Sequence, residues 1–300
     1  MPVLVVGSIA YDSIETPFGK ISEAAGGSAL YFCAAASFFS PVNVVAVVGE
    51  DFDQSILNFL KQRDVNFDGM SVKSGKTFRW GGKYLTDMNV RETHFTDLNV
   101  FEDFNPEIPH VYKTCTSLFL ANIDPDLQLQ VLDSVKNPQL VIMDTMNYWI
   151  GTKAKSLERV INRCDVLILN DEETRELTGN NNLITAGRQI LKMGPSHLII
   201  KKGEHGALLL NNKFVFAAPA YPTEKVVDPT GAGDTFAGGV VGYLSRKNKI
   251  NLNDLRKSIL YGTTLASFTV EDFSFRKLET VTQKDIDARY KKLLKMISLV

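Results

Sequence analysis

The sequence has few cysteines and lacks a long apolar run. Its 300 residues include only three cysteines, Cys33, Cys115 and Cys164, far apart in the chain. An odd number at wide spacing excludes a disulfide framework and favours reduced thiols. No apolar run approaches the roughly 18 residues of a membrane span, and the N-terminus lacks the basic region and cleavage site of a signal peptide. We therefore expect a cytoplasmic protein with no membrane partner.

An excess of either charge is also missing. The 33 Lys and Arg residues against 34 Asp and Glu residues give a formal net charge of -1, which argues against a protein that coats nucleic acid. No CxxC or HExxH pair suggests a zinc site, and the four histidines form no recognisable triad with a serine. What is present is a normal globular balance, with 44% hydrophobic and 22% charged residues.

Short apolar runs alternate with helix-like segments along most of the chain. The runs are continuously apolar, which is typical of parallel strands covered on both faces. This alternation predicts a doubly wound α/β sheet. Expected strands are 3–6, 42–48, 117–120, 140–143, 166–169 and 198–201, and a hairpin is expected around 211–212. Expected helices are 28–39, 53–63, 126–136, 153–163, 172–177, 183–192, 232–246, 252–268 and 284–297.

Two segments, 14–21 and 70–101, do not fit this alternation. They are polar, strand-like and carry aromatic residues. We interpret them as a small β lid inserted into one domain that spans residues 1–300. The alternative is a long surface loop, which is uncommon in compact domains at this length.

Residues 227–239, VDPTGAGDTFAGG, carry the most specific pattern in the chain. Small residues allow the backbone to approach a ligand, and an apolar set that starts at once predicts a helix from about Ala232. The amides of Gly231, Ala232 and Gly233 would then face open space before a helix N-terminus, which is an anion site. Asp234, in the first turn, could take a proton from an alcohol. The alternative is that Asp234 only complements the helix dipole.

The segment DPTGAGDTFAGG resembles the C-terminal signature of the ribokinase-like, PfkB-type carbohydrate kinases. Four other segments match in the same order, so the resemblance runs over essentially the whole chain. It implies a three-layer α/β/α sandwich with a mostly parallel central sheet and a small β-stranded lid. It also implies ATP and Mg²⁺ as cofactors and a carbohydrate-like acceptor.

Two N-terminal segments match the sugar-binding part of that family. Asp12 follows the first strand, where the resemblance implies a carboxylate that accepts hydrogen bonds from substrate hydroxyls. Without the family, an Asx-turn would be the simpler interpretation. Gly26 and Gly27 match a glycine pair whose backbone touches the sugar. Tyr31 stands where the family usually has Asn, so it either contacts the acceptor or belongs to the core.

Two later segments match the nucleotide side. Asn170 and Glu173 resemble a motif that places Mg²⁺ and phosphate through water, and their spacing also fits a capping box at a helix start. Lys202, Gly203 and Gly206 resemble a nucleotide-binding turn. For Lys202 the alternative is ordinary charged surface.

Weaker candidates lie past other strand ends, where open α/β sheets bind ligands. Asn122 and Asp144 are assigned to the acceptor cleft, with a loop role as the alternative. Thr230 is assigned to the nucleotide side, and Asp228 matches a position beside a potassium ion in some relatives. The lid cations Arg79, Lys83 and Arg91 either bind a sugar phosphate or protect the edge strands.

The sequence therefore predicts an ATP-dependent phosphotransferase that acts on a hydroxyl of a sugar, a polyol or a nucleoside. Asp234 is the expected base and residues 231–233 the anion hole. The alternatives are a nucleoside kinase of the same family and a sugar or nucleoside sensor without turnover. The resemblance leaves open whether the lid forms a homodimer, because its edge charges equally favour a monomer.

Overall fold

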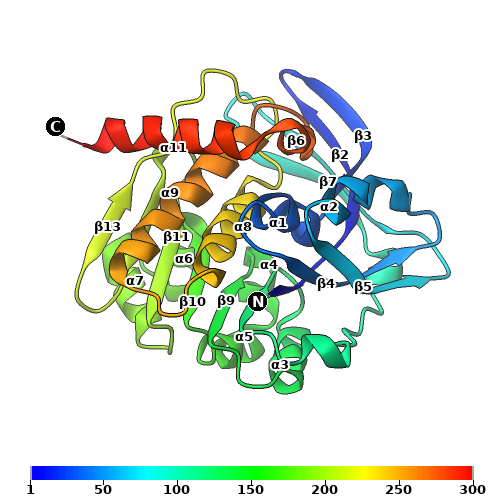
Figure 1. Cartoon of the computed structure of the whole chain (residues 1–300), viewed down its shortest axis with the longest axis horizontal. Coiled ribbons are helices and arrows are strands. Elements are labelled where there is room, and N and C mark those ends of the chain that lie inside the picture. Colours follow the sequence, from blue (N-terminus) through cyan, green and yellow to red (C-terminus); the bar gives the residue numbers. More distant parts are fainter. Residues whose placement is uncertain (1, 299–300) are drawn as a thin grey trace.

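The centre of the molecule is a nine-stranded sheet, seen in Figure 1, and the computed structural model describes residues 2–298. Its strands are β1 (Val3–Val6), β4 (Val42–Gly49), β5 (Val65–Lys73), β8 (Ser117–Leu120), β9 (Leu140–Asp144), β10 (Val166–Asn170), β11 (His197–Lys201), β12 (Ala207–Leu210) and β13 (Val215–Ala218). They lie in the order β13-β12-β11-β10-β9-β8-β1-β4-β5. From β11 to β5 the pairing is parallel, and β12 and β13 add an antiparallel hairpin. The predicted doubly wound α/β sheet is confirmed.

The first strand shows why the predicted strands read as continuous apolar runs. Successive side chains of a strand point to opposite faces of its sheet. In β1, Val3 and Val5 belong to one hydrophobic core, and Leu4 and Val6 belong to the other. Because both faces are covered, every position of the strand must be apolar.

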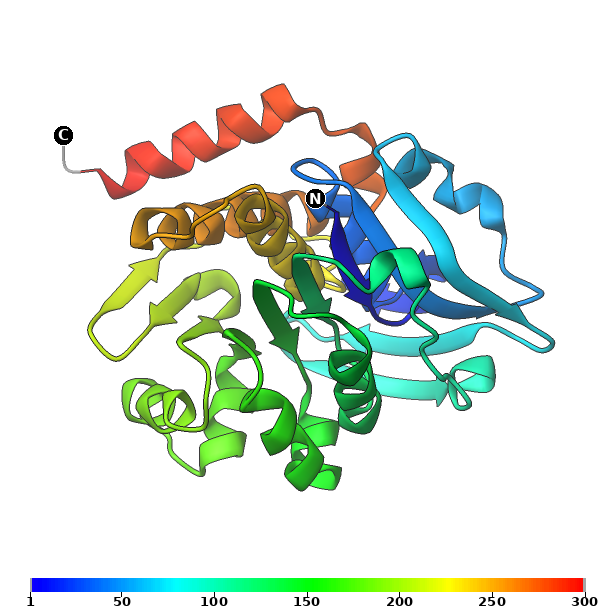
Figure 2. The ribbon, with the colours of Figure 1, turned by 60° about the horizontal axis from the view of Figure 1, so that its bottom comes forward.

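Helices cover both faces of the sheet (Figure 2). One core contains apolar residues of α1 (Ser28–Ala36), α2 (Asn58–Lys61), α8 (Ala232–Ser245), α9 (Leu252–Thr269), α10 (Arg276–Thr280) and α11 (Gln283–Ile297). The other core takes residues from α3 (Pro125–Ser134), α4 (Asn147–Thr152), α5 (Ala154–Ile161), α6 (Asp171–Thr178) and α7 (Leu183–Leu191). Red, orange and gold helices lie on one side in Figure 2 and green helices on the other. The chain thus has the three-layer sandwich that the resemblance implied.

A second sheet forms the lid. It has four strands, β2 (Ala10–Thr16), β3 (Gly19–Gly26), β6 (Phe78–Tyr84) and β7 (Arg91–Asp97), in the order β3-β2-β6-β7. The lid sheet therefore includes more of the N-terminal segment than the predicted 14–21. At the other end, part of the predicted 70–101 belongs elsewhere, because β5 pairs with β4 in the main sheet up to Lys73. Both differences arise because the pairing of a strand with its neighbours, and not its local sequence, decides which sheet it joins.

Other differences from the predicted elements are small. Helices α4 and α10 were not predicted, and the expected helix 53–63 is divided into a 3-10 helix, Gln54–Leu57, and α2. Cys33, Cys115 and Cys164 are buried and unpaired, as expected. Within residues 2–298, none of the helices combines the length and the apolar character that crossing a membrane requires.

Candidate active site

The turn before α8 is the centre of the site. Gly231 is the N-cap of α8 and has a φ of 72°, in the left-handed region that glycine adopts without strain. A Cβ on Gly231 would lie 2.3 Å from the ring of Tyr31. The ring of Tyr31 therefore packs directly on the glycine backbone, and no larger residue fits between α1 and this turn.

The three residues of the expected anion hole are not equivalent. The Ala232 N–H donates to the Pro229 carbonyl at 3.2 Å, which closes a turn. This differs from the expectation that all three amides face open space, because entry into the helix uses the middle one. Ala232 and Gly233 line a cavity of about 460 Å³ in front of the helix, called here the α8 cavity. A cavity at this end of α8 meets the positive end of the helix dipole.

Asp234 lies in the first turn of α8, as predicted. Burial raises the pKa of its carboxyl from 3.8 to about 7, and the Asp144 carboxylate adds to the rise. The cations Lys201 and Arg91 oppose it. A carboxyl with a pKa near neutrality is suited to accept a proton, because it is both ionised and basic at ordinary pH.

Lys201, which the sequence analysis missed, lies beside the same turn. Its Nζ would be 3.2 Å from a Cβ on Gly233, and it forms a 2.7 Å ion pair with Asp144. Burial alone would lower the pKa of Lys201, but the Asp144 and Glu173 carboxylates outweigh it and raise the pKa above its ordinary value. Lys201 therefore keeps a positive charge beside the turn before α8. The available signal was its place as the last residue of a strand.

Asn170 and Glu173 form the capping box of α6. The Asn170 side chain accepts from the Glu173 N–H at 2.7 Å, and the Glu173 carboxylate accepts from the Asn170 N–H at 2.6 Å. Asn170 pairs in register with Lys201 on the neighbouring strand, so both lie at the same sheet edge. Burial raises the pKa of Glu173 to about 7, with Lys201 opposing and Asp144 adding to the rise. The capping interpretation is confirmed, and the side chains also lie near the site.

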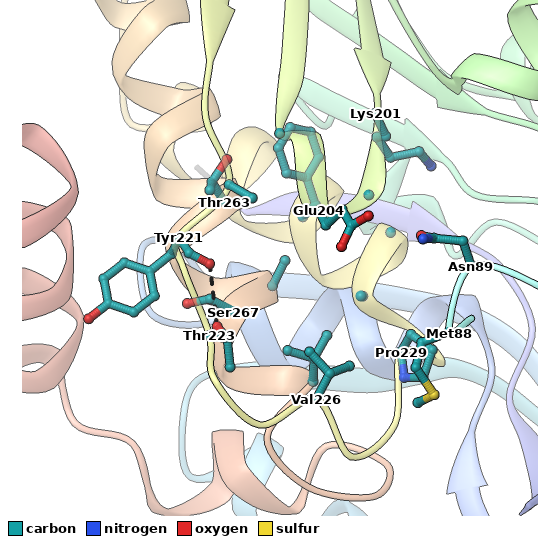
Figure 3. A pocket seen from close by; sticks show the side chains of 18 of the residues that line it. Met88, Asn89, Lys201, Glu204, Tyr221, Thr223, Val226, Pro229, Thr263 and Ser267 are labelled. Carbon is teal, nitrogen blue, oxygen red and sulfur yellow. Dashed lines mark hydrogen bonds between the residues drawn. The ribbon is translucent and has the colours of Figure 1, made fainter. Parts of the chain in front are cut away.

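Besides α8 itself, the α8 cavity has walls from the turn after β11, from α9, from the loop before α8 and from the lid, shown in Figure 3. Gly203, Glu204 and Gly206 come from the turn after β11, and Thr263, Ala266 and Ser267 from α9. The loop before α8 contributes Ala220, Tyr221, Pro222, Thr223, Val226 and Pro229. The lid contributes Met88 and Asn89 from the turn between β6 and β7.

Within this cavity, the predicted lysine and the observed one differ by a single position. Lys201 lines the cavity, and the predicted contact Lys202 belongs instead to the short connection after β11. The lid also contacts this part of the cavity, because the Asn89 Oδ1 would lie 2.8 Å from a Cβ on Gly203. Asn89, in the lid turn between β6 and β7, thus contacts Gly203, in the turn after β11.

Asp12, Gly26 and Gly27 lie together, near enough to Asp234 for its charge to act on Asp12. We call this group, with Tyr31 and Asp228, the Asp12 cluster. Asp12 is 4% exposed, and a Cβ on Gly26 would lie 1.9 Å from its Oδ2. Burial raises the pKa of Asp12 to about 8, the Asp228 and Asp234 carboxylates add to the rise, and a hydrogen bond from the Gly27 amide opposes it.

Tyr31 and Asp228 are the most buried members of the Asp12 cluster. Tyr31 is 1% exposed and belongs to the core, which was one of its two predicted roles. Burial raises the pKa of Asp228, although its oxygens accept hydrogen bonds from the Thr230 and Ser274 amides at 2.8 and 3.2 Å. The Thr230 hydroxyl donates to the Tyr84 hydroxyl at 3.2 Å, which joins the lid to the turn before α8.

The remaining candidates are divided between structural and site positions. The Asn122 side chain accepts from the Trp149 indole at 3.0 Å and donates to Met146, so its amide is engaged in the loop. Arg79 pairs with Glu23 and Asp51, and Lys83 pairs with Glu15. Arg91 differs from these two cations, because its charge lowers the pKa of Asp234 and of Glu173. Of the three predicted lid cations, Arg91 is thus the one that acts on the site.

The carboxylates near the α8 cavity fit a cation that also has phosphate ligands. Among residues 2–298, no three His, Cys, Asp or Glu side chains are arranged to hold a metal by themselves. Burial is the main cause of the raised pKa values of Asp234 and Glu173, and the Asp144 carboxylate adds to both, so a further cation beside them would stabilise their ionised forms. Mg²⁺ suits such a site, since it keeps several waters and takes few protein ligands together with substrate phosphates.

Comparison with known proteins gives a consistent result. A family model described as pfkB family carbohydrate kinase matches residues 3–280. A cytidine kinase from Thermococcus kodakarensis is 26% identical over 82% of this chain and 89% of that protein. The crystal structure of a nucleoside kinase from Methanocaldococcus jannaschii has a TM-score of 0.77 at 22% identity and covers 97% of this chain and 99% of that one. A ribokinase-like protein from E. coli, solved with ATP and Mg²⁺, has a TM-score of 0.79 at 18% identity over 97% of this chain and 99% of that one.

Proposed function

The chain belongs to the pfkB family of carbohydrate kinases, a family of phosphotransferases, and we propose that it transfers the terminal phosphoryl group of ATP to a hydroxyl of a sugar or a sugar-like alcohol. The observation that carries this proposal is the position of Asp234. Its carboxyl, with a pKa raised to about 7, follows Gly233, which lines the α8 cavity, and its charge raises the pKa of Asp12 in the Asp12 cluster. A base close to both is where an acceptor hydroxyl and a phosphoryl group would meet.

The reaction follows from that arrangement. Asp234 takes the proton of the acceptor hydroxyl, whose oxygen forms a bond to the terminal phosphorus. The bond from that phosphorus to the bridging oxygen of ADP breaks, and ADP leaves with the electron pair. The Gly231 and Gly233 amides and the Lys201 ammonium stabilise the charge on the transferring group, because fixed donors in a buried site need no reorganisation.

Asp144 is assigned a supporting role in the same proposal. It holds Lys201 by the 2.7 Å ion pair, and its Oδ1 accepts from the Thr145 amide at 2.8 Å. A carboxylate fixed from both sides can orient the lysine toward the turn before α8. We therefore move Asp144 from the acceptor cleft, where the sequence placed it, to the phosphate side.

The cations are proposed on the chemistry of the nearby side chains. Glu173, together with Asn170, would hold Mg²⁺ through water, and a bound Mg²⁺ supplies neutralisation of phosphate charge. A monovalent cation such as K⁺ is proposed beside Asp228, whose buried carboxylate has a raised pKa and no ion pair among the described residues. The test compares turnover in potassium and sodium salts at equal ionic strength.

Asp12 and Gly27 are proposed to hold the acceptor. A hydroxyl that donates to the Asp12 carboxylate favours its ionised form and so compensates for burial. Gly27, with a φ of 91° and a Cβ position only 2.6 Å from the Ser8 carbonyl, admits no side chain, and its amide donates to the Asp12 carboxylate. Gly27 thus positions Asp12, and the acceptor is recognised mainly by that carboxylate.

The experiment is a measurement of ADP release with sugars, polyols and nucleosides as acceptors. The proposal expects at least one acceptor to raise ADP release well above the rate without acceptor. Calorimetric binding of an acceptor with no ADP release from any of them would instead favour a sensor without turnover. The intact Asp234 argues against the sensor, because binding alone needs no base.

A nucleoside is the second candidate acceptor, and Trp80 is the observation that favours it. In the lid, Asp12 and Trp80 are register partners on parallel strands, so their side chains share a face. The Trp80 ring lies over Gly82, where a Cβ would be 2.6 Å from it. A flat indole on the Asp12 face provides a surface on which a base could stack. The similarity to a cytidine kinase points the same way.

The nucleoside candidate has a matched test within the lid. Phe95 covers Gly81 at 2.2 Å from its Cβ position and belongs to the opposite face from Trp80. We expect Trp80→Leu to raise the KM of a nucleoside about tenfold, from the loss of stacking, and Phe95→Leu to leave it nearly unchanged. Equal effects of both substitutions, or no effect of either, would exclude base stacking on Trp80.

A further inference from the structure

Helix α11 does not line the α8 cavity, but one of its side chains contacts residues that do. This helix spans Gln283–Ile297 and lies beyond residue 280, where the match to the family model ends. One of its side chains, Arg289, is directed back toward the cavity walls and is only 16% exposed. Its neighbours on the same helix, Lys291 and Lys292, are exposed. A cation that is turned inward, while adjacent cations face solvent, has a specific partner.

The partners of Arg289 belong to two different walls of the α8 cavity. The guanidinium donates to the Ser267 hydroxyl at 3.0 Å, and Ser267 lines the cavity from α9. Its Cζ also lies 4.8 Å from the centre of the Tyr221 ring, and Tyr221 lines the cavity from the loop before α8. Figure 3 shows the Tyr221 ring turned away from the cavity, so its backbone forms the wall and its ring forms the anchor.

Two further contacts hold the guanidinium in place. It forms a 2.7 Å ion pair with Glu271 and lies 3.5 Å from the centre of the Phe268 ring. An arginine is suited to this place, because its planar group stacks on aromatic rings while its edge donates several hydrogen bonds. Arg289 thus links α9 to the loop before α8. It contacts both from the side that faces away from the cavity.

We infer that Arg289 is a positioning residue for the nucleotide, through Tyr221 and Ser267. The loop from 219 to 231 has no helix or strand of its own. The Val227 amide donates to the Val270 carbonyl at 2.7 Å and ties the second half of the loop to the end of α9, so the distance of the first half from α9 depends on Arg289. Without Arg289 the segment around Tyr221 can move away from α9, which widens the cavity and lowers its affinity for a nucleotide. The inference rests on the proposed function only in that the α8 cavity takes ATP and ADP.

The first experiment compares Arg289→Met with Lys292→Met, an exposed position on the same helix. Arg289→Met should weaken calorimetric binding of ADP about tenfold, in line with a lost cation–π contact and charged hydrogen bond, and should raise the KM of ATP similarly. The kcat and the acceptor KM should change less than about twofold, because the Asp12 cluster is untouched. Lys292→Met should change none of these values. Arg289→Lys, which keeps the charge but not the planar group, should recover only part of the affinity.

The calorimetric measurement needs no turnover, so its result stands even if the protein proves not to be a kinase. An unchanged ADP affinity in a folded Arg289→Met protein would overturn the inference, and so would an equal fall in ADP affinity, kcat and acceptor affinity. If Arg289→Met does not fold, Tyr221→Leu removes the anchor and leaves the Arg289–Glu271 pair in place. Tyr221→Leu should then show the same selective loss. In the double variant, the two effects should be less than additive.

Discussion

The α8 cavity and the Asp12 cluster, on the two sides of Asp234, are built by opposite means. The α8 cavity is an open space of about 460 Å³ with a mixed lining of small, apolar and polar residues, in which Lys201 stays charged. The Asp12 cluster is closely packed, with Asp12 4% exposed and Asp228 0% exposed. Its carboxyl pKa values are raised. The α8 cavity can bind a phosphate directly through groups that do not titrate near neutral pH, although Glu173, which is assigned to Mg²⁺, has a pKa of about 7. The Asp12 cluster depends on carboxylates with raised pKa values.

The difference assigns separate tasks to the two sides. Backbone amides and Lys201 offer a phosphate the same donors at any ordinary pH, so nucleotide affinity without Mg²⁺ should vary little with pH. The Asp12 cluster and Asp234 change their protonation near neutrality, so acceptor binding and chemistry should carry the pH dependence. Each prediction below tests whether a perturbation on one side leaves the other side unaffected.

The largest effect is expected from Asp234→Asn, at the boundary between the two sides. An amide has nearly the same shape but accepts no proton from the acceptor, so turnover should fall about 10³-fold or more. ADP binding should remain within about twofold, since the turn before α8 is unchanged. Steady-state ADP release and calorimetry measure the two quantities.

The control for that prediction is Asp126→Asn, in the first turn of α3. If Asp234 only complemented a helix dipole, the two substitutions would have similar small effects, of about 1 kcal/mol or less on stability. Turnover that survives in Asp234→Asn would remove the proposed base. A joint loss of turnover and ADP binding would show that the two sides are not separable at this residue.

The sequence predicted those features of the fold and the site that depend on residues close together in the chain. The capping box of Asn170 and Glu173 and the place of Asp234 in the first turn of α8 depend on spacing within a few residues, and both were predicted. Strand β1 was predicted at its observed bounds, because burial on both faces leaves an uninterrupted apolar run. These features can be read from neighbouring residues without knowledge of distant contacts.

The features that depend on distant contacts were wrong or missed. Lys201 was overlooked in favour of Lys202, since only the register between β10 and β11 shows which lysine meets the turn before α8. The pairing of Lys73 in the main sheet rests on its contact with β4, which no local pattern reveals. Arg289 acts across cavity walls that are distant in sequence from α11. Tertiary pairing, rather than residue type, determines all three.

The second largest effect is expected from Lys201→Met. Removing one fixed cation from the transferring group should lower kcat about 10²-fold and raise the KM of ATP, with the acceptor KM nearly unchanged. Lys202→Met is the matched control, and it should change each parameter less than about twofold. Initial rates over a grid of both substrate concentrations separate the parameters.

Because Lys201→Met leaves the Asp144 carboxylate buried without its partner, a loss of thermal stability is also expected. The double variant Lys201→Met with Asp144→Asn should recover part of the stability but none of the lost kcat. Recovery of both would mean that Lys201 serves the fold alone. Equal kinetic effects of Lys201→Met and Lys202→Met would contradict the assignment of the cavity lysine.

The pH dependence of kcat/KM for the acceptor is the next effect in size. The pKa of Asp234 is raised to about 7, so its basic form is lost as the pH falls through that value. Between about pH 6 and pH 8, kcat/KM should rise about tenfold, since this parameter reports the free enzyme. The raised pKa of Asp12, about 8, should extend the rise to higher pH.

The opposite sign is expected for the stability of the protein without ligands. A buried carboxyl whose folded pKa exceeds its unfolded value binds more protons in the folded state, so its contribution to stability falls as the pH rises. For Asp12 this interval runs from its ordinary pKa of 3.8 to about 8. ADP affinity measured by calorimetry without Mg²⁺ should change less than tenfold between about pH 6 and pH 8. A tenfold change in ADP affinity between about pH 6 and pH 8 would break the separation of the two sides.

The smallest effect is expected from Tyr84→Phe, which removes the hydrogen bond between the lid and Thr230. One neutral hydrogen bond contributes about 0.5–1.5 kcal/mol, so the acceptor KM should rise about threefold, while ADP affinity should not change. Tyr11→Phe is the matched control, because the Tyr11 hydroxyl also joins the lid to main-chain atoms, at Asp51 and Asp53, but on the other face of the lid. Equal acceptor effects from both substitutions would mean that general lid attachment matters, and an accompanying loss of ADP affinity would place Tyr84 on the nucleotide side.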